Sequence, residues 1–179
     1  MRIVSGQYRG RTILPPKNFS ARPTTDFAKE ALFNIIAVNF DVEQLAALDL
    51  FSGAGSITYE LASRGCRSVD SVEADFRHYS FIKKTVQALK FPQVRCFKAD
   101  AFSFLASCRA TYDIIFADPP YDMEGTERIH GLIFERRLLA PDGWFILEHS
   151  RGKNFSEAAH FKEHRSYGSV NFSIFRQAP

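Results

Sequence analysis

The sequence predicts an α/β protein with a Rossmann-like, doubly wound sheet of seven mostly parallel strands. Short apolar runs alternate with amphipathic segments of about ten residues along most of the chain, which is typical of right-handed βαβ units. The last two apolar runs have no helical segment between them, so we expect an antiparallel hairpin at one edge of the sheet. A length of 179 residues is enough for one such domain.

Ahead of this alternation, residues 1–20 are expected to form a small basic β-hairpin, an extension of the main domain at residues 21–179. Arg2–Ser5 and Arg11–Leu14 can be its strands, because two glycines between them permit a turn. The pair Pro15-Pro16 should end the second strand, since proline cannot donate to a strand ladder.

The elements of the main domain are assigned from the period of their apolar residues and from end signals. Thr24 or Thr25 can cap the first helix, which has Asp26 in its first turn. Pro141-Asp142-Gly143 is expected to be a turn. Helices are expected at residues 25–38, 57–63, 75–89, 101–107 and 124–139, and strands at residues 47–51, 68–73, 94–98, 113–117, 144–149, 163–167 and 170–175.

Charge is unevenly distributed along the chain. The net charge is +3, but residues 1–25 carry five basic residues and no acidic residue. A basic segment on a slightly acidic body favours a polyanionic partner such as nucleic acid, although a solvated tail would have the same composition. The candidate nucleic-acid contacts are Arg2, Arg9, Arg11, Lys17 and Arg22.

Membrane, secreted and metal-binding classes are not favoured. No apolar run approaches the ~18 residues of a membrane span, and the first residues lack the apolar stretch of a secretion signal, so we expect a cytoplasmic protein. Cys66, Cys96 and Cys108 have neither zinc nor redox spacing, and the five histidines are scattered. We therefore expect no metal site.

In an open α/β sheet, ligands bind beyond the carboxyl ends of the strands, so the residues at these ends are the candidate site. The first such end carries Asp49 and a glycine loop that can bring a ligand against the backbone. A dinucleotide loop would have a third glycine where this chain has Thr58, so the loop fits a nucleoside without a pyrophosphate better. The candidate positions in the loop are Phe51, Gly53 and Gly55.

Acidic residues end the next two strands. Glu73 can accept both hydroxyls of a ribose, although a surface acid at a strand end is an alternative. Asp100, followed by Ala101, can accept the amino hydrogen of an adenine, or it caps the helix that begins at 101, or it does both.

The tetrapeptide Asp118-Pro119-Pro120-Tyr121 after the fourth strand is the most specific signal. Its two prolines remove two N–H donors, which leaves the Asp118 carboxylate and backbone carbonyls as acceptors for an exocyclic amino group. Tyr121 offers a flat face on which an extruded base can stack. This set predicts methylation of an amino group on a nucleic-acid base; the alternative is a proline-terminated loop with an incidental aromatic residue.

With these motifs together, the sequence resembles class I methyltransferases that act on amino groups, and more closely the bacterial ribosomal RNA small subunit methyltransferase D family. The family-specific parts are the opening MRIVSGQYRGR and the block RPTTDFAKEALFNII at residues 22–36. LDLFSGAGS (48–56), LASRG (61–65), VEAD (72–75) and DIIFADPPYD (113–122) are shared more widely.

The resemblance implies that residues 21–179 are a methyltransferase domain that uses S-adenosylmethionine. The implied target is N2 of one guanine in the 16S rRNA of the small ribosomal subunit, with the basic hairpin on RNA phosphates. By position, Asp118, Pro119, Pro120 and Tyr121 would be catalytic. The implied cofactor contacts are Asp49, Phe51, Gly53 and Gly55 in general, Glu73 for the ribose, Asp100 and Ala101 for the adenine, and Thr24 and Thr25 for the methionine end.

Three other functions remain open at this point. N6-adenine methylation of RNA or DNA would use the same tetrapeptide, although this chain has no room for a DNA-recognition domain. A non-catalytic RNA-binding module is disfavoured by the acids at the strand ends, and a nicotinamide oxidoreductase by Thr58. The glycine loop FSGAGSITYEL also departs from the usual FAGSGALGLEA, which leaves the substrate in more doubt than the cofactor. We expect a monomer.

Overall fold

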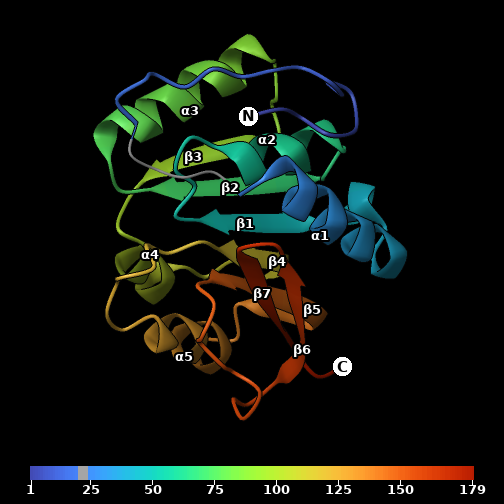
Figure 1. Cartoon of the computed structure of the whole chain (residues 1–179), viewed down its shortest axis with the longest axis vertical. Helices are drawn as coiled ribbons and strands as arrows, with labels where there is room; N and C mark the ends of the chain where they lie inside the picture. The colour runs from blue at the N-terminus through green and yellow to red at the C-terminus, as the bar shows by residue number, and fades with distance from the viewer. Residues whose placement is uncertain (20–23) are drawn as a thin grey trace.

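The computed structural model describes residues 1–19 and 24–179, and at its centre lies a seven-stranded sheet (Figure 1). Its strand order is β3-β2-β1-β4-β5-β7-β6. The first five strands in this order, β3, β2, β1, β4 and β5, pair in parallel with their neighbours. Strand β7 is antiparallel to both β5 and β6. The predicted sheet with its antiparallel edge hairpin is confirmed. The strands are β1 (Ala46–Leu50), β2 (Ser68–Glu73), β3 (Val94–Lys98), β4 (Tyr112–Ala117), β5 (Leu139–His149), β6 (Phe161–Tyr167) and β7 (Val170–Arg176).

Helices cover both faces of this sheet (Figure 1). Side chains of α1, α2 and α3 belong to one apolar core, and those of α4 and α5 belong to a second core on the other face. Thr25 caps α1, because its hydroxyl accepts the Ala28 N–H at 3.2 Å. The helices are α1 (Asp26–Asn39), the 3-10 turn η1 (Val42–Gln44), α2 (Ser56–Ser63), α3 (Phe76–Ala88), α4 (Ala101–Ser107) and α5 (Glu127–Glu135).

The two cores follow from the alternation of side chains along buried strands. Ala47 of β1 and Ile114 of β4 belong to the α1–α3 core, whereas the next residues, Leu48 and Ile115, belong to the α4–α5 core. All four are buried. Because both faces of β1 and β4 are covered, their carboxyl ends are held rigidly at the centre of the sheet.

Residues 1–19, which we call the N-terminal head, form a short antiparallel pairing and also dock on α2. Within the head, Arg2 and Thr12 form one antiparallel bridge and the Ile3 N–H donates to the Arg11 carbonyl at 2.9 Å, so the pairing is present but shorter than the strands expected at Arg2–Ser5 and Arg11–Leu14. The Val4 and Ser5 N–H groups instead donate to the Glu60 carboxylate at 2.8 and 3.1 Å.

The docked head is also packed closely against the end of α2. A Cβ on Gly6 would lie 1.9 Å from the Ser63 carbonyl oxygen, so this position requires glycine. Ile3 and Ile13 are buried in the α1–α3 core. The division of the chain between residues 20 and 21 stays a prediction, since that boundary lies outside the described residues.

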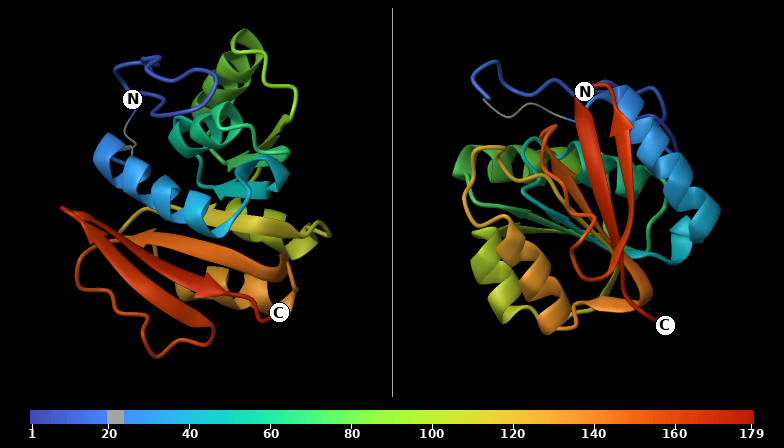
Figure 2. Two further views of the ribbon diagram at one scale, coloured as in Figure 1. Left: turned by 90° about the vertical axis from the view of Figure 1, so that its right-hand side faces the viewer. Right: turned by 60° about the horizontal axis from the view of Figure 1, so that its bottom comes forward.

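Helix α1 lies between the N-terminal head and the β6–β7 hairpin (Figure 2). On the head side, the Lys29 ammonium donates to the Arg2 carbonyl at 2.6 Å. On the hairpin side, the Phe27 ring meets Tyr167 edge-on, with 5.9 Å between the ring centroids. The helix therefore connects the first and last segments of the chain.

The two largest differences from the predicted element boundaries are at the start of β5 and the end of α5. Pro141-Asp142-Gly143 is not a turn, because it lies inside the long strand β5, where the register with β4 shifts between Tyr112 and Ile114. Asp142 has a φ of 62°, so the irregularity that the sequence signals is taken up within the strand. Helix α5 ends at Glu135 rather than at residue 139, because Arg137 adopts a φ of 54° and the Leu138 N–H returns to the Ile133 carbonyl.

Across residues 1–19 and 24–179, no helix combines the length and the apolar character that a membrane crossing requires. In the same residues, no three His, Cys, Asp or Glu side chains are grouped in a way that could hold a metal ion.

Candidate active site

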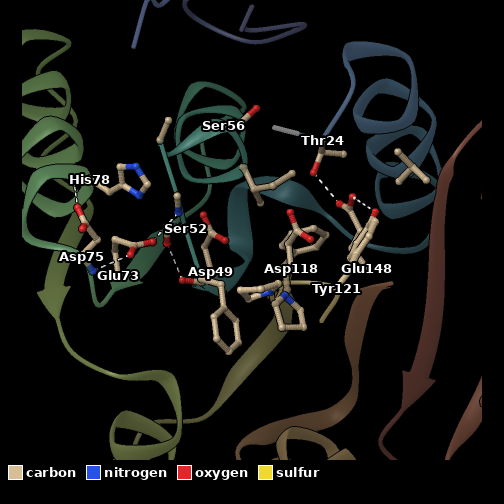
Figure 3. A pocket seen from close by; sticks show the side chains of 18 of the residues that line it. Thr24, Asp49, Ser52, Ser56, Glu73, Asp75, His78, Asp118, Tyr121 and Glu148 are labelled. Carbon is tan, nitrogen blue, oxygen red and sulfur yellow. Dashed lines mark hydrogen bonds between the residues drawn. The ribbon is translucent and has the colours of Figure 1, made fainter. Parts of the chain in front are cut away.

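A cavity of about 590 Å³ opens at the carboxyl ends of the central strands (Figure 3). Its walls come from the loop between β1 and α2, the start of α3, the turn after β4, the end of β5 and the β6–β7 turn. The volume is in the range of a small-molecule site. The lining residues are Thr24, Asp49, Phe51, Ser52, Gly53, Ala54, Ser56, Ile57, Glu73, Asp75, Arg77, His78, Phe116, Asp118, Pro119, Pro120, Tyr121, Glu148, Ser169 and Val170.

Most of the predicted site residues meet in this cavity. The nine that line it are Thr24, Asp49, Phe51, Gly53, Glu73, Asp118, Pro119, Pro120 and Tyr121. Four do not line it: Thr25, Gly55, Asp100 and Ala101. Thr25 caps α1, and Asp100 is an exposed cap of α4 that accepts the Ser103 N–H at 3.0 Å, so for Asp100 at least the capping alternative holds. A cofactor role for these four residues stays a prediction.

Backbone N–H groups orient the Glu73 carboxylate at the mouth of the glycine loop. Gly53 donates to Glu73 Oε2 at 2.7 Å, and Asp75 donates to Oε1 at 2.8 Å. Glu73 is half-buried, so its oxygens remain accessible from the cavity. Gly55 has a φ of 90° and leaves space for the Tyr59 ring, because a Cβ there would lie 2.4 Å from that ring. Gly53 therefore orients Glu73 through its N–H group, whereas Gly55 is needed because a side chain there would meet the Tyr59 ring.

Asp49 lies at the floor of the cavity, where neutral hydroxyl groups surround it. Thr58 Oγ1 donates to Asp49 Oδ2 at 2.6 Å, and the Ser52 hydroxyl donates to the Asp49 carbonyl at 2.8 Å. Ser71 Oγ lies 3.0 Å from Thr58 Oγ1 and 2.9 Å from Ser52 Oγ, which completes a buried hydroxyl cluster. Burial raises the pKa of the Asp49 carboxyl to about 7, and the hydroxyl donors offset only part of this rise.

The turn after β4 carries Asp118 into the middle of the cavity, between Asp49 and Glu148 (Figure 3). The Met123 N–H donates to the Pro120 carbonyl at 2.9 Å and closes the turn. Burial, together with the negative charges of Glu148 and Asp49, raises the pKa of Asp118 well above its ordinary value. Asp118 is therefore a stronger base than an exposed aspartate.

Glu148 is a cavity residue that the sequence reasoning missed. It comes from the end of β5, accepts a hydrogen bond from the Thr24 hydroxyl at 2.6 Å and lies 3.4 Å from the Tyr121 hydroxyl (Figure 3). Its side chain is buried beside the strand that leads to Asp118. A signal was available, because Glu148 is the last but one residue of β5, close to the carboxyl end of that strand, as Glu73 is the last residue of β2.

Most of the other missed residues lie around the glycine loop and the start of α3. His78 is the most notable, because its buried Nε2 has no hydrogen-bond partner among the described residues. An unpartnered buried nitrogen is costly, so Nε2 is available to a bound ligand. No periodicity or motif in the sequence distinguishes this histidine from the other four. The remaining missed residues are Ser52, Ala54, Ser56, Ile57, Asp75, Arg77, Phe116, Ser169 and Val170.

The predicted RNA contacts lie in the N-terminal head. Arg2, Arg9, Arg11 and Lys17 are all exposed. Arg11 lies over the Tyr8 ring at 5.6 Å from its centroid, and Arg2 Nε is 3.6 Å from the Asp26 carboxylate. Arg22, the fifth predicted contact, lies outside the described residues.

With the fold and the cavity described, comparison with known proteins is informative. Among solved structures, a putative methyltransferase from Escherichia coli superposes with a TM-score of 0.87 at 28% identity, covering 99% of this chain and 98% of that one. A putative methylase from Haemophilus influenzae superposes with a TM-score of 0.82 at 26% identity, covering 99% and 98% of the two chains.

Sequence relatives agree with these structures. The putative rRNA methyltransferase YlbH of Bacillus subtilis is 33% identical over 184 residues and covers 99% of both chains. The ribosomal RNA small subunit methyltransferase D of Escherichia coli is 35% identical over 150 residues, which are 83% of this chain and 71% of that protein. The family model described as conserved hypothetical protein 95 matches residues 1–176. The chain therefore belongs to this family of methyltransferases, and its predicted membership of the ribosomal RNA small subunit methyltransferase D family is confirmed.

Proposed function

We propose that this protein methylates the exocyclic N2 of a guanine in the 16S rRNA of the small ribosomal subunit, with S-adenosylmethionine as methyl donor. The observation that carries the proposal is the Asp118-Pro119-Pro120-Tyr121 turn, which faces the same cavity as the glycine loop and Glu73. An acceptor for an amine and a nucleoside site are thereby placed together. The names of the sequence relatives support a ribosomal RNA substrate.

The residues on the β1–β2 side of the cavity fit the cofactor. Glu73 presents an oriented carboxylate for the ribose hydroxyls, and Gly53 leaves room for the ligand against the backbone. Phe51 and Asp49 complete this part of the wall. The further cofactor contacts that we propose are Thr24 and Thr25 for the methionine end, Gly55 in the loop, and Asp100 with Ala101 for the adenine.

The residues on the β4 side fit the target base. Pro119 and Pro120 have no backbone N–H, so the turn offers the Asp118 carboxylate and the Pro119 carbonyl as acceptors for the two amine hydrogens. The Tyr121 side chain is 44% exposed at the cavity, where an extruded base could stack on its ring. These contacts would hold the amine nitrogen with its lone pair directed toward the cofactor side of the cavity.

The reaction is a direct transfer. When bound, S-adenosylmethionine supplies the methyl group from its sulfonium and leaves as a neutral thioether. As the N2–carbon bond forms, the nitrogen becomes cationic and must lose a proton. Asp118 accepts this proton, because its raised pKa makes it a stronger base at the position where the positive charge develops. Holding the reactants in line supplies much of the acceleration.

The N-terminal head would bind the RNA backbone. Arg2, Arg9, Arg11 and Lys17 are exposed there, and phosphate contacts of this kind position a substrate without reading its sequence. Arg22 completes the proposed set. A cytoplasmic location and a monomeric state, which fit a ribosomal RNA substrate, stay predictions.

The experiment that tests the proposal is a product analysis. The purified protein is incubated with labelled S-adenosylmethionine and small ribosomal subunits from a strain that lacks it, and the rRNA is digested to nucleosides. We expect N2-methylguanosine at a single position of 16S rRNA, by mass spectrometry. Exclusive formation of N6-methyladenosine would favour the adenine alternative, and absence of any methylated nucleoside would overturn the proposal.

A further inference from the structure

Among residues 1–19 and 24–179, Glu148 is the one carboxylate besides Asp118 that lines the base side of the cavity. Strands β4 and β5 are parallel neighbours, so the residues at their carboxyl ends lie side by side. The influence of the Glu148 charge on the pKa of Asp118 is a second sign that the two groups are close. Figure 3 shows both side chains directed to the same part of the cavity.

Contacts on either side fix the orientation of Glu148. The Thr24 hydroxyl, 124 residues away in sequence, donates to Oε2 at 2.6 Å, which is a short hydrogen bond to a carboxylate. The contact of Oε1 with the Tyr121 hydroxyl is 3.4 Å, at the long end of hydrogen bonds. A carboxylate has about four lone-pair sites, so these contacts leave it able to accept another donor in the cavity.

Purine bases differ at the ring position next to the reactive amine. In guanine, N1 carries a hydrogen, so the 2-amino group and N1 form two adjacent donors. In adenine, N1 next to the 6-amino group is an acceptor with a lone pair. Two neighbouring carboxylates match the first pattern, whereas the second would set a lone pair against a carboxylate oxygen.

We propose that Glu148 accepts the N1–H of the target guanine while Asp118 accepts its 2-amino group, so that Glu148 makes the enzyme specific for guanine. The inference rests on the proposed function and names the residue that chooses the base. The donor-free turn of Pro119 and Pro120 reinforces the choice, since it offers nothing to an acceptor at N1. Sites built to pair a particular donor reject analogues that lack it by large factors.

The test compares two bases at one position. Once product analysis has located the methylated guanine, 16S rRNA is prepared with guanine or with 2-aminopurine at that position. 2-Aminopurine keeps the 2-amino group, but its N1 is an acceptor. We expect the wild-type enzyme to prefer guanine by roughly 100-fold or more in kcat/KM. Glu148→Gln, whose amide can donate to N1, should reduce this preference by at least about tenfold.

The ratio of the two kcat/KM values separates specificity from damage. If Glu148 only supports the fold, Glu148→Gln lowers activity on both bases by the same factor, the ratio stays unchanged, and the inference is overturned. A melting temperature and a calorimetric affinity for S-adenosylmethionine similar to the wild type would support a folded variant. The matched control is Glu157→Gln, the same change at an exposed residue, which should alter neither ratio nor rate. Failure of the proposed function itself is a different result: no N2-methylguanosine from the wild-type enzyme.

Discussion

The buried carboxylates of this protein fall into two groups that differ in their charged partners. Glu60 of α2 and Asp70 of β2 lie away from the cavity, and each has cationic partners. Arg64 Nε is 2.7 Å from Glu60 Oε1, and Arg95 donates to both oxygens of Asp70 at 2.7 Å. Tyr112 adds a third donor to Asp70 at 2.7 Å. These acids join segments that are distant in sequence.

The acids of the cavity are arranged otherwise. Neither Asp49 nor Asp118 forms an ion pair with any lysine or arginine of the described residues, and the pKa of each is raised. The difference teaches that charge is neutralised where it supports the fold and left for a ligand to neutralise where the reaction takes place. Substitutions in each group test whether the two kinds of acid have these different roles.

The largest effect is expected at Asp118. Asp118→Ala should lower kcat/KM for RNA methylation by roughly 1,000-fold or more, because it removes both the amine acceptor and the base. Calorimetry should show S-adenosylmethionine binding within about twofold of the wild type. Full turnover by this variant would show that Asp118 has no role in the reaction. The contrast between the cavity acids and the paired acids would then have no functional meaning.

The next effect tests the structural group. Glu60→Ala should lower the free energy of unfolding by about 3–5 kcal/mol, because it removes the carboxylate 3.8 Å from the buried Lys29 ammonium and leaves the backbone N–H groups of Val4 and Ser5 without their acceptor. Urea denaturation measures the change. The control is Asp142→Asn, which breaks an exposed pair with Arg176 and should change stability by less than about 1 kcal/mol. Equal effects of the two changes would contradict the special status of Glu60.

Asp49 should make stability depend on pH with the opposite sign from a paired acid. Its pKa is about 7 in the fold and about 4 in the unfolded chain, so the folded state binds the extra proton between these values. Stability from this group is present below about pH 4 and is lost as the pH rises to about 7. Relative to Asp49→Asn, the wild type should lose up to about 4 kcal/mol across this window, as read from denaturation at several pH values. Parallel curves for the two proteins would show that Asp49 is not a destabilised acid.

A smaller effect concerns the acid side of the pH–rate profile. Asp118 must be unprotonated to accept from the amine, so kcat/KM should fall as the pH drops through the raised pKa of Asp118. Glu148→Gln removes one of the charges that raise this pKa, so the acid limb should move to lower pH. Rates measured against pH for both proteins check the direction. An acid limb that moves to higher pH, or does not move, would show that the charge of Glu148 does not raise the pKa of Asp118.

The sequence predicted those parts of the site that depend on neighbouring residues. The Asp118-Pro119-Pro120-Tyr121 turn could be found because it directly follows a recognisable strand, and Glu73 because it is the last residue of one. The sequence left Thr24 and Thr25 as alternative caps of α1, and the structure shows that Thr25 is the cap.

The parts that could not be predicted depend on contacts between distant segments. The hydrogen bond between Thr24 and Glu148 joins residues 124 positions apart, and nothing local to either residue indicates the other. The docking of the head on α2 could not be predicted for the same reason. The head pairs with itself over a shorter length than expected, and Glu60 and Ser63 of α2 accept hydrogen bonds from its neighbouring backbone.

Helix α2 has a consequence for the geometry of the substrate. Its first residue, Ser56, lines the cavity, and its last residue, Ser63, is pressed against Gly6 of the head. Eight residues rise by about 12 Å, and a helix of this length does not stretch. The helix therefore sets a fixed distance between the wall of the cavity and the segment proposed to hold phosphates. An RNA that contacts both must match that distance.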